Sequence, residues 1–91
     1  MKSEVYKCNS SIVLREEDDE ALLFNPDNSD IVVLNSTGRF IWEYCDGKNT
    51  KKEILDKMLE EFSVSAEEAG KDLDSFLTSL LEKGFIQSKK G

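Results

Sequence analysis

The stretch that decides the fold is Asp30-Ile31-Val32-Val33-Leu34-Asn35-Ser36-Thr37-Gly38, within which the pattern of apolar residues changes. Ile31–Leu34 is a run of β-branched and bulky apolar residues, which is typical of a strand. Directly after it, Asn35 or Ser36 can cap a helix that we expect to reach about Cys45. Strands therefore precede this point in the chain, and helices follow it.

Two more short apolar runs lie upstream, at Ile12–Leu14 and Leu22–Phe24. The acidic segment Glu16–Glu20 and the turn-forming segment Asn25–Asp30 separate the three runs. Because connections this short join antiparallel neighbours, the sequence predicts a three-stranded antiparallel meander with the last run at one edge. We expect Val5-Tyr6 to extend or flank this sheet.

Two further helices are predicted downstream. The capping boxes Thr50–Glu53 and Ser65–Glu68 each precede apolar residues at helical spacing, and Gly84 ends the longer, third helix. Phe85-Ile86 is expected to fold back on the core, and Gln87–Gly91 is expected to be a polar tail. The predicted architecture is α+β: a winged helix-turn-helix in which a three-stranded antiparallel meander is followed by three helices.

Length and composition indicate one domain over residues 1–91, with a core over about residues 12–86. A chain of this size buries about 60–65% of the surface that its unfolded form exposes, which leaves little room for a large internal pocket. His, the commonest general base and metal ligand, is absent. Cys8 and Cys45 form no C-x-x-C pair, so we expect reduced thiols and no zinc site. The sequence therefore predicts neither an enzyme nor a cofactor or metal site.

The charge balance of 12 Lys and Arg against 19 Asp and Glu gives a formal net charge of −7, which disfavours binding to nucleic acid. The third predicted helix would read DNA in a winged helix-turn-helix, yet it carries five acids against only Lys71 and Lys83. No run approaches the roughly 20 apolar residues of a membrane span, and the N-terminus lacks the apolar region of a signal peptide. We therefore expect a cytoplasmic protein that contacts neither nucleic acid nor membrane.

The predicted edge strand Ile31–Leu34 lacks the usual protection of an edge. Native edge strands carry Lys, Pro, bulges or inward charges, whereas here only Asp30 stands at the entrance. The strand could be paired on both sides, or the third helix could shield it. Alternatively, an extended peptide could add as a fourth strand in the trough between strand and helix, or a second copy could pair there and form a strand-exchanged dimer.

Several short motifs share the order and spacing of one family. They are a strand end with a helix start, a short apolar helix before Cys-Asp-Gly, and a later apolar helix before Gly-Phe-Ile: Val33-Leu34-Asn35-Ser36-Thr37-Gly38, Ile41-Trp42, Cys45-Asp46-Gly47 with Thr50 and Ile54, Asp72-Leu73, Phe76-Leu77, Leu80 and Gly84-Phe85-Ile86. From about Ile12 to Ile86 the chain thus resembles the PqqD family. The acidic run Glu16–Glu20 departs from the family's usual form, which leaves the specificity of the peptide or enzyme contact open.

The resemblance implies a non-catalytic adaptor. PqqD-like domains are recognition elements that bind the leader segment of a ribosomally synthesised, post-translationally modified peptide by strand addition and present it to a modifying enzyme. The enzyme partner it implies is a radical S-adenosylmethionine enzyme or, in lasso-peptide systems, a leader peptidase. Carried over by position, the peptide-binding residues belong to the third strand and to the facing side of the third helix: Asp30, Ile31, Val32, Val33, Leu34, Asp72, Ser75, Phe76 and Ser79.

Other readings of these residues stay open at this stage. Phe76 and Leu80 could instead be plain core residues, as an apolar helical stripe usually is. Asn35 and Asp46-Gly47 are interpreted mainly as cap and turn residues. The alternative functions are a winged-helix DNA-binding regulator, for which the cluster Lys48, Lys51 and Lys52 would contact the backbone, and a generic acidic protein-interaction module.

Overall fold

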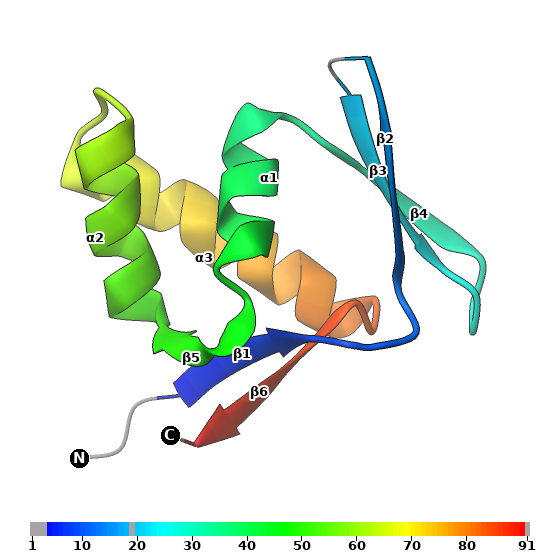
Figure 1. The fold of residues 1–91 in the computed structure, drawn as a ribbon. Coiled ribbons are helices and arrows are strands. Elements are labelled where there is room, and N and C mark those ends of the chain that lie inside the picture. Colours follow the sequence, from blue (N-terminus) through cyan, green and yellow to red (C-terminus); the bar gives the residue numbers. More distant parts are fainter. Residues whose placement is uncertain (1–3, 19, 91) are drawn as a thin grey trace.

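Two three-stranded antiparallel sheets and three helices form the fold over residues 4–18 and 20–90, the part of the chain that the computed structural model describes (Figure 1). In chain order the elements are β1 (Glu4–Cys8), β2 (Val13–Glu17), β3 (Glu20–Asn25), β4 (Asp30–Leu34), α1 (Ser36–Glu43), β5 (Asp46–Thr50), α2 (Lys51–Glu61), α3 (Ala66–Glu82) and β6 (Ile86–Lys90). The prediction of an α+β fold, with a three-stranded antiparallel meander followed by three helices, is confirmed.

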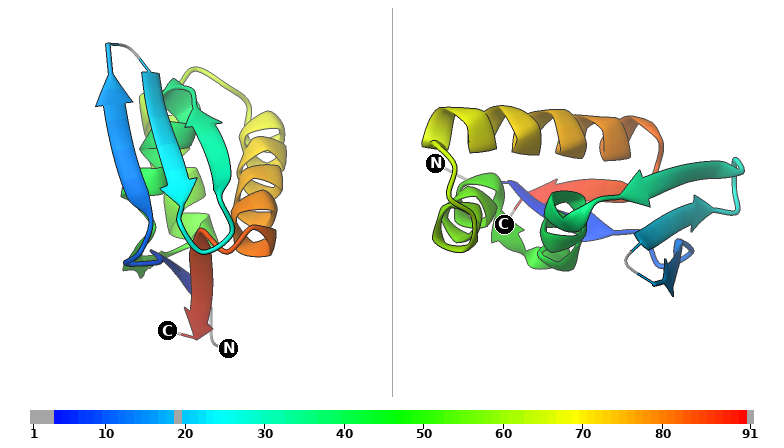
Figure 2. Two further views of the ribbon diagram at one scale, coloured as in Figure 1. Left: turned by 90° about the vertical axis from the view of Figure 1, so that its right-hand side faces the viewer. Right: turned by 90° about the horizontal axis from the view of Figure 1, so that it is seen from above.

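The meander has the strand order β2-β3-β4, and its three strands stand side by side in the left view of Figure 2. Asp18 (φ 53°) and Ser29 (φ 62°) adopt the left-handed backbone that tight hairpin connections use. In the central strand Leu23 lies opposite Leu14 of β2 and Val32 of β4. Successive side chains point to opposite faces of this sheet, which therefore has an inner face toward the helices and an outer face away from them.

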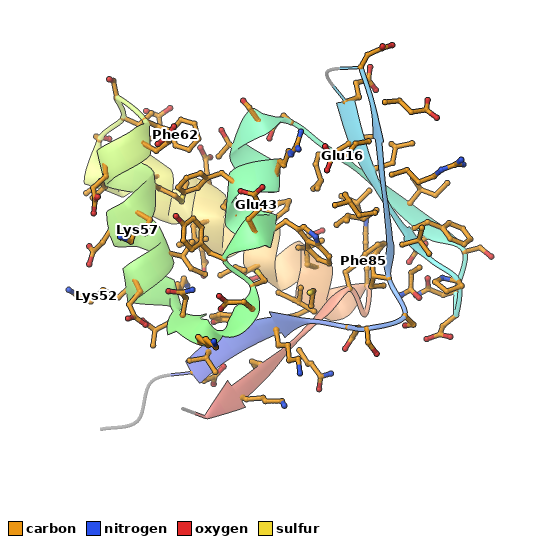
Figure 3. All side chains as sticks on the ribbon, in the orientation of Figure 1. Glu16, Glu43, Lys52, Lys57, Phe62 and Phe85 are labelled. Carbon is orange, nitrogen blue, oxygen red and sulfur yellow. The ribbon has the colours of Figure 1, made fainter. Side chains whose placement is uncertain are left out.

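The inner face of the meander packs against the helices to form the core. The sheet contributes Ala21, Leu23 and Leu34, each at most 3% exposed. The other buried apolar residues of the core come from the helices, β1 and the segments around them: Tyr6, Ile41, Cys45, Ile54, Met58, Ala69, Leu73, Leu77, Leu80, Phe85 and Ile86. Phe85, labelled in Figure 3, is fully buried, which confirms that Phe85-Ile86 folds back on the core.

A second sheet, with the strand order β5-β1-β6, has no counterpart in the sequence-based prediction. Its central strand β1 contains the buried Val5-Tyr6, which therefore belongs to a separate sheet and does not extend the meander. The predicted polar tail over Gln87–Gly91 is wrong for residues 87–90, which pair with β1, and Gly91 lies outside the described residues. These polar residues form a strand because backbone pairing with β1 satisfies them without an apolar pattern of their own.

Side-chain caps begin the helices where the sequence predicts them. The Asn35 side chain accepts a hydrogen bond from the Gly38 backbone N–H at 2.7 Å, and thereby caps α1. Thr50 and Glu53 form the predicted capping box of α2. The Ser65 hydroxyl accepts from the first turn of α3 at 3.2 Å. Each cap satisfies a backbone N–H that has no partner within its own helix.

The segment after α1 differs from the prediction. The helix ends at Glu43, short of the predicted Cys45, because the chain turns there into β5. Gly47 is left-handed (φ 82°), as expected, but it lies within this strand. The Asp46 carboxylate accepts from the Lys48 backbone N–H at 2.9 Å, so the turn interpretation of Asp46 is correct in its local bonding. Among the helices of residues 4–18 and 20–90, none combines the length and the apolar character needed to cross a membrane.

Candidate functional site

One long side of β4 forms the candidate site. In the described residues β4 pairs with β3 alone, and its other side faces α3. The left view of Figure 2 shows α3 beside β4, and in both views the helix and the strand run in opposite directions. The alternative in which this strand is paired on both sides is therefore wrong, because the N-terminal strand joins the other sheet. We call the space between β4 and α3 the trough.

The backbone alternation of the meander determines which groups of β4 reach the free edge. The carbonyl of Asn25, at the end of β3, accepts from the Ser29 N–H at 2.8 Å and so points toward β4. Asn25 and every second residue before it therefore direct their backbone groups to β4, where they lie opposite Asp30, Val32 and Leu34. The N–H and C=O groups of Ile31 and Val33 consequently point out of the sheet at its free edge.

The first end of the trough is tied by asparagine side chains. The Asn25 amide donates to the Lys83 carbonyl at 3.0 Å, and the Asn28 amide donates to the same carbonyl at 3.1 Å. Lys83 is the C-terminal cap of α3, so these bonds satisfy a carbonyl that the helix itself leaves unpaired. Asn25 is only 2% exposed, which makes this link a fixed part of the structure. The turn between β3 and β4 is thereby held against the end of α3.

The second end of the trough is closed by an aromatic contact. A Cβ atom at Gly38 would lie 3.1 Å from Cε1 of Phe76 and 3.4 Å from Cδ2 of Leu34. Only a residue without a side chain lets the Phe76 ring of α3 approach the first turn of α1 so closely. The ring is half-buried and packs against the core, in agreement with the core interpretation of Phe76.

A cavity of about 360 Å³ opens beside this contact. It is lined by residues from the start of α1 and from the middle of α3: Asn35, Thr37, Gly38, Ile41, Asp72, Ser75 and Phe76. Apolar side chains and the ring of Phe76 line one part of it, and hydroxyl, amide and carboxylate groups line the rest. The cavity can therefore accept a bulky side chain and offer it polar partners.

The nine predicted site residues fall into three groups in the structure. Asp72, Ser75 and Phe76 come together in the cavity, and Ser79 is half-buried one turn further along α3. Asp30, Val32 and Leu34 share the inner face of β4, with Leu34 almost fully buried. Ile31 and Val33 instead point to the outer face, and their exposed fractions are 59% and 63%. Only their backbone groups belong to the edge.

Sequence reasoning missed several residues of the cavity. Thr37, Gly38 and Ile41 line it, and Asn35 lines it as well as capping α1. The capping signal at Asn35 was recognised, but a cap does not reveal that the helix start faces another helix. A glycine in the first turn of a helix is the one local signal that could have indicated a close neighbour.

Negative charge predominates along the trough. Asp72 lies at the cavity, and Asp30 is at the entrance of β4. The described residues form ion pairs elsewhere, between Arg39 and Glu16, Lys51 and Asp74, and Lys52 and Asp56. No group of His, Cys, Asp and Glu in residues 4–18 and 20–90 is arranged to hold a metal ion. The arrangement is an unpaired strand edge beside a trough with an acidic lining.

The family model described as coenzyme PQQ synthesis protein D (PqqD) matches residues 20–86. The chain belongs to the PqqD family. The resemblance drawn from the sequence motifs is thus confirmed. The matched range includes all of β3, β4 and the three helices, and therefore the whole trough of this PqqD-family chain.

Three solved structures are similar to this PqqD-family chain. TbiB1 in complex with the TbiA(beta) leader peptide is 27% identical, with a TM-score of 0.77 over 89% of this chain and 94% of that chain. Lasso peptide synthetase B1 complexed with the leader peptide is 20% identical, with a TM-score of 0.78 over 90% of this chain and 96% of that chain. The heterocyclase TruD is 18% identical, with a TM-score of 0.64 over 94% of this chain and 12% of that chain. At such low identity the last two show a shared fold. Among curated proteins, none matches the chain.

Proposed function

We propose that this chain binds the leader segment of a ribosomally synthesised precursor peptide as an added strand on β4 and presents it to a modifying enzyme. The observation that carries the proposal is the free, apolar edge of β4, which lies open beside α3 in a member of the PqqD family. The structure of the 27% identical TbiB1, which holds a leader peptide, supports it. Adding a strand pairs the backbone groups that an edge otherwise leaves to water.

Affinity would come mainly from the backbone of β4. The N–H and C=O groups of Ile31 and Val33 point outward and can pair with an extended peptide. The alternation of an added strand would then send every second leader side chain into the trough. One of these would reach the cavity beside Phe76, whose volume of about 360 Å³ suits an aromatic or branched apolar side chain.

Selectivity would follow from charge as well as from shape. Asp30 and Asp72 stand at the edge strand and at the cavity, on a chain with a net charge of −7. Lys or Arg in the leader would pair with them, and the overall charge would speed the approach of a basic peptide at low ionic strength. A leader recognised by this chain is therefore expected to combine a bulky apolar residue with at least one basic residue.

The partner enzyme in this proposal is a radical S-adenosylmethionine enzyme or a leader peptidase, and the chain itself is non-catalytic. We expect this chain, the precursor peptide and the enzyme to meet in the cytoplasm, where the precursor is synthesised. A DNA-binding role is not favoured, because the helix that would enter the groove carries Glu67, Glu68, Asp72, Asp74 and Glu82. A strand-exchanged dimer would use the same edge of β4 and would therefore compete with the peptide.

The substitution Val33→Pro tests the proposal, because it removes an N–H at the free edge. Proline is tolerated on edge strands when its nitrogen faces away from the sheet, so the fold should survive. Val33→Ala is the matched control, since it removes the same side chain and keeps the N–H. The probe is the synthetic TbiA(beta) leader peptide, which the structure of the similar TbiB1 contains, and a second probe is the leader of any short precursor found to be encoded near this chain.

In calorimetric titration, Val33→Pro is expected to weaken leader binding at least about tenfold, the effect of losing one backbone hydrogen bond. Val33→Ala is expected to change it less than about threefold. Circular dichroism should show folded protein for both variants. Leader affinity that neither substitution lowers would contradict strand addition at β4. An equal loss of affinity in both folded variants would also contradict it, because the effect would then belong to the side chain.

A further inference from the structure

The outer face of the meander is apolar and uncovered. It carries the alternate side chains that point away from the helices, and we define it as Val13, Arg15, Leu22, Phe24, Ile31 and Val33. Val13, Ile31 and Val33 are 45%, 59% and 63% exposed. The left view of Figure 2 looks directly at this face, and no described element lies in front of it. A contiguous group of exposed apolar side chains of this kind is often a functional surface.

The side chains on this face form two rows across the three strands. Val13, Phe24 and Ile31 lie opposite one another in the first row. Arg15, Leu22 and Val33 form the second row. A shallow cavity of about 390 Å³ lies over them, lined by Val13, Arg15, Leu22, Phe24 and Ile31. The two rows end at β4, at the same strand edge to which we assign the leader.

Acidic residues lie at one end of the outer face, at the turn between β2 and β3. Beyond the second row, a cavity of about 300 Å³ is lined by Glu17, Asp18 and Glu20 together with Arg15 and Leu22. Three acids of the hairpin between β2 and β3 therefore lie beside Arg15 in this cavity. A partner that covers the apolar rows and also reaches the tip of this hairpin is expected to carry Lys or Arg there.

The size and charge of the face argue against a second copy of this chain as its occupant. Three strands of five to six residues cover a footprint of roughly 250 Å². A stable interface needs about 800 Å² on each partner. Two copies would also bring two acidic tips and two net charges of −7 together. The face suits a transient contact with a basic partner, as a protein that hands over a peptide requires.

We propose that the outer face docks the modifying enzyme, through a surface of that enzyme that is apolar and bordered by Lys or Arg. This inference rests on the proposed leader binding at β4 and extends it. Leader side chains opposite Ile31 and Val33 would lie on the outer side of the sheet and lengthen both rows by one residue. The enzyme would thus contact the sheet and the leader strand at the same time, and the loaded chain would bind it more tightly than the empty chain.

The substitution Val13→Asp tests the inference on the strand most distant from the leader edge. Val64→Asp is the matched control, because Val64 is similarly exposed, at 40%, but lies between α2 and α3. The probe is the purified modifying enzyme encoded with the precursor peptide, titrated onto the immobilised full chain with and without leader. The same two variants are titrated with leader alone.

We expect Val13→Asp to weaken enzyme binding at least about tenfold, as expected from the loss of a buried Val contact. Leader affinity should stay within about twofold, and Val64→Asp should match the unchanged chain in both titrations. The unchanged chain should bind the enzyme more tightly when leader is present and more weakly as salt is raised.

Enzyme binding that Val13→Asp leaves unchanged would overturn the docking proposal, as would failure of the wild-type chain to bind the enzyme with leader present. Light scattering that shows a dimer of the wild-type chain, lost in Val13→Asp, would also overturn it by assigning the face to a second copy. If the leader fails to bind while the enzyme binds in a Val13-dependent way, the proposed function fails and the docking surface stands.

Discussion

The two sheets of this chain both contain three antiparallel strands, yet they are assembled in different ways. β2, β3 and β4 follow one another and are joined by short turns. β5, β1 and β6 come instead from the middle, the beginning and the end of the described chain. The first sheet therefore depends on local sequence, whereas the second depends on the helices that bring its strands together.

The edges of the two sheets differ as well. β6, an edge of the second sheet, reads Ile-Gln-Ser-Lys-Lys, and lysines of this kind protect an edge against pairing. β4, an edge of the first, reads Asp-Ile-Val-Val-Leu and has no such protection. The second sheet thus behaves as a closed support, and the first exposes an edge on which an extended peptide can pair. The two sheets thus differ in how their edges are protected, although both contribute buried residues to the core.

Deleting residues 87–91 should break the second sheet and is the largest effect we expect. Residues 87–90 pair with Glu4–Lys7 of β1, and their loss would leave β1 without one neighbour. A few backbone hydrogen bonds at about 1 kcal/mol each give a decrease of about 2–5 kcal/mol in the free energy of unfolding. Urea unfolding followed by circular dichroism measures it.

Lys89→Glu serves as the control for this deletion, because Lys89 is exposed and the substitution keeps the strand. It should change the free energy of unfolding by less than about 0.5 kcal/mol. A deletion that is as mild as Lys89→Glu would mean that β6 adds nothing to stability, as expected of a polar tail.

The difference between the sheets also explains how much of the fold can be predicted from the sequence. The meander, the three helices and the caps at Asn35, Thr50 and Ser65 follow from runs, turns and capping residues that lie close together in the chain. β5 and β6 are polar, with segments Asp46–Thr50 and Ile86–Lys90 that show no apolar alternation. Their pairing with β1 depends on contacts between distant segments, which local pattern does not record.

The candidate site divides in the same way. The undefended edge of β4 could be inferred from the residues of the strand itself. The position of Asp72 and Ser75 on the facing helix followed from the family resemblance. The cavity beside Phe76 could not, because it forms only where α1 meets α3 through Gly38. Which β4 side chains face outward could be resolved only once the register with β3 was known.

Alkaline pH should weaken the second sheet through Cys45, whose carbonyl accepts from the Cys8 N–H of β1 at 2.9 Å. Burial, reinforced by Cys8, raises the pKa of the Cys45 thiol from 9.0 to about 12. Between these values the unfolded thiol ionises while the folded one keeps its proton, so the stability falls as pH rises through this window. Burial also raises the pKa of Tyr6, which acts in the same direction at higher pH.

The substitution Cys45→Ala isolates this effect. The free energy of unfolding of the natural chain should fall by up to about 1.4 kcal/mol per pH unit more than that of the variant above pH 9. Urea unfolding at pH 8.0, 9.5 and 10.5 gives the two slopes. Parallel slopes would show that Cys45 titrates alike in the folded and unfolded chains.

Replacing one glycine in α3 and one in α1 gives the smallest effects, and these differ in sign. In α3, a Cβ at Gly70 would meet nothing within 4 Å, so Gly70→Ala should raise the free energy of unfolding by about 0.5–1 kcal/mol through helix propensity alone.

In α1, a Cβ at Gly38 would stand 3.1 Å from the Phe76 ring. Gly38→Ala should therefore show no net gain from helix propensity and should lower the free energy of unfolding by about 1 kcal/mol. It should also weaken leader binding, because the Phe76 ring would move into the cavity. Chemical unfolding and peptide titration of the two variants measure both effects. A Gly38→Ala protein that is as stabilised as Gly70→Ala and binds the leader normally would show that the ring of Phe76 can yield, and that the closed end of the trough does not shape the cavity.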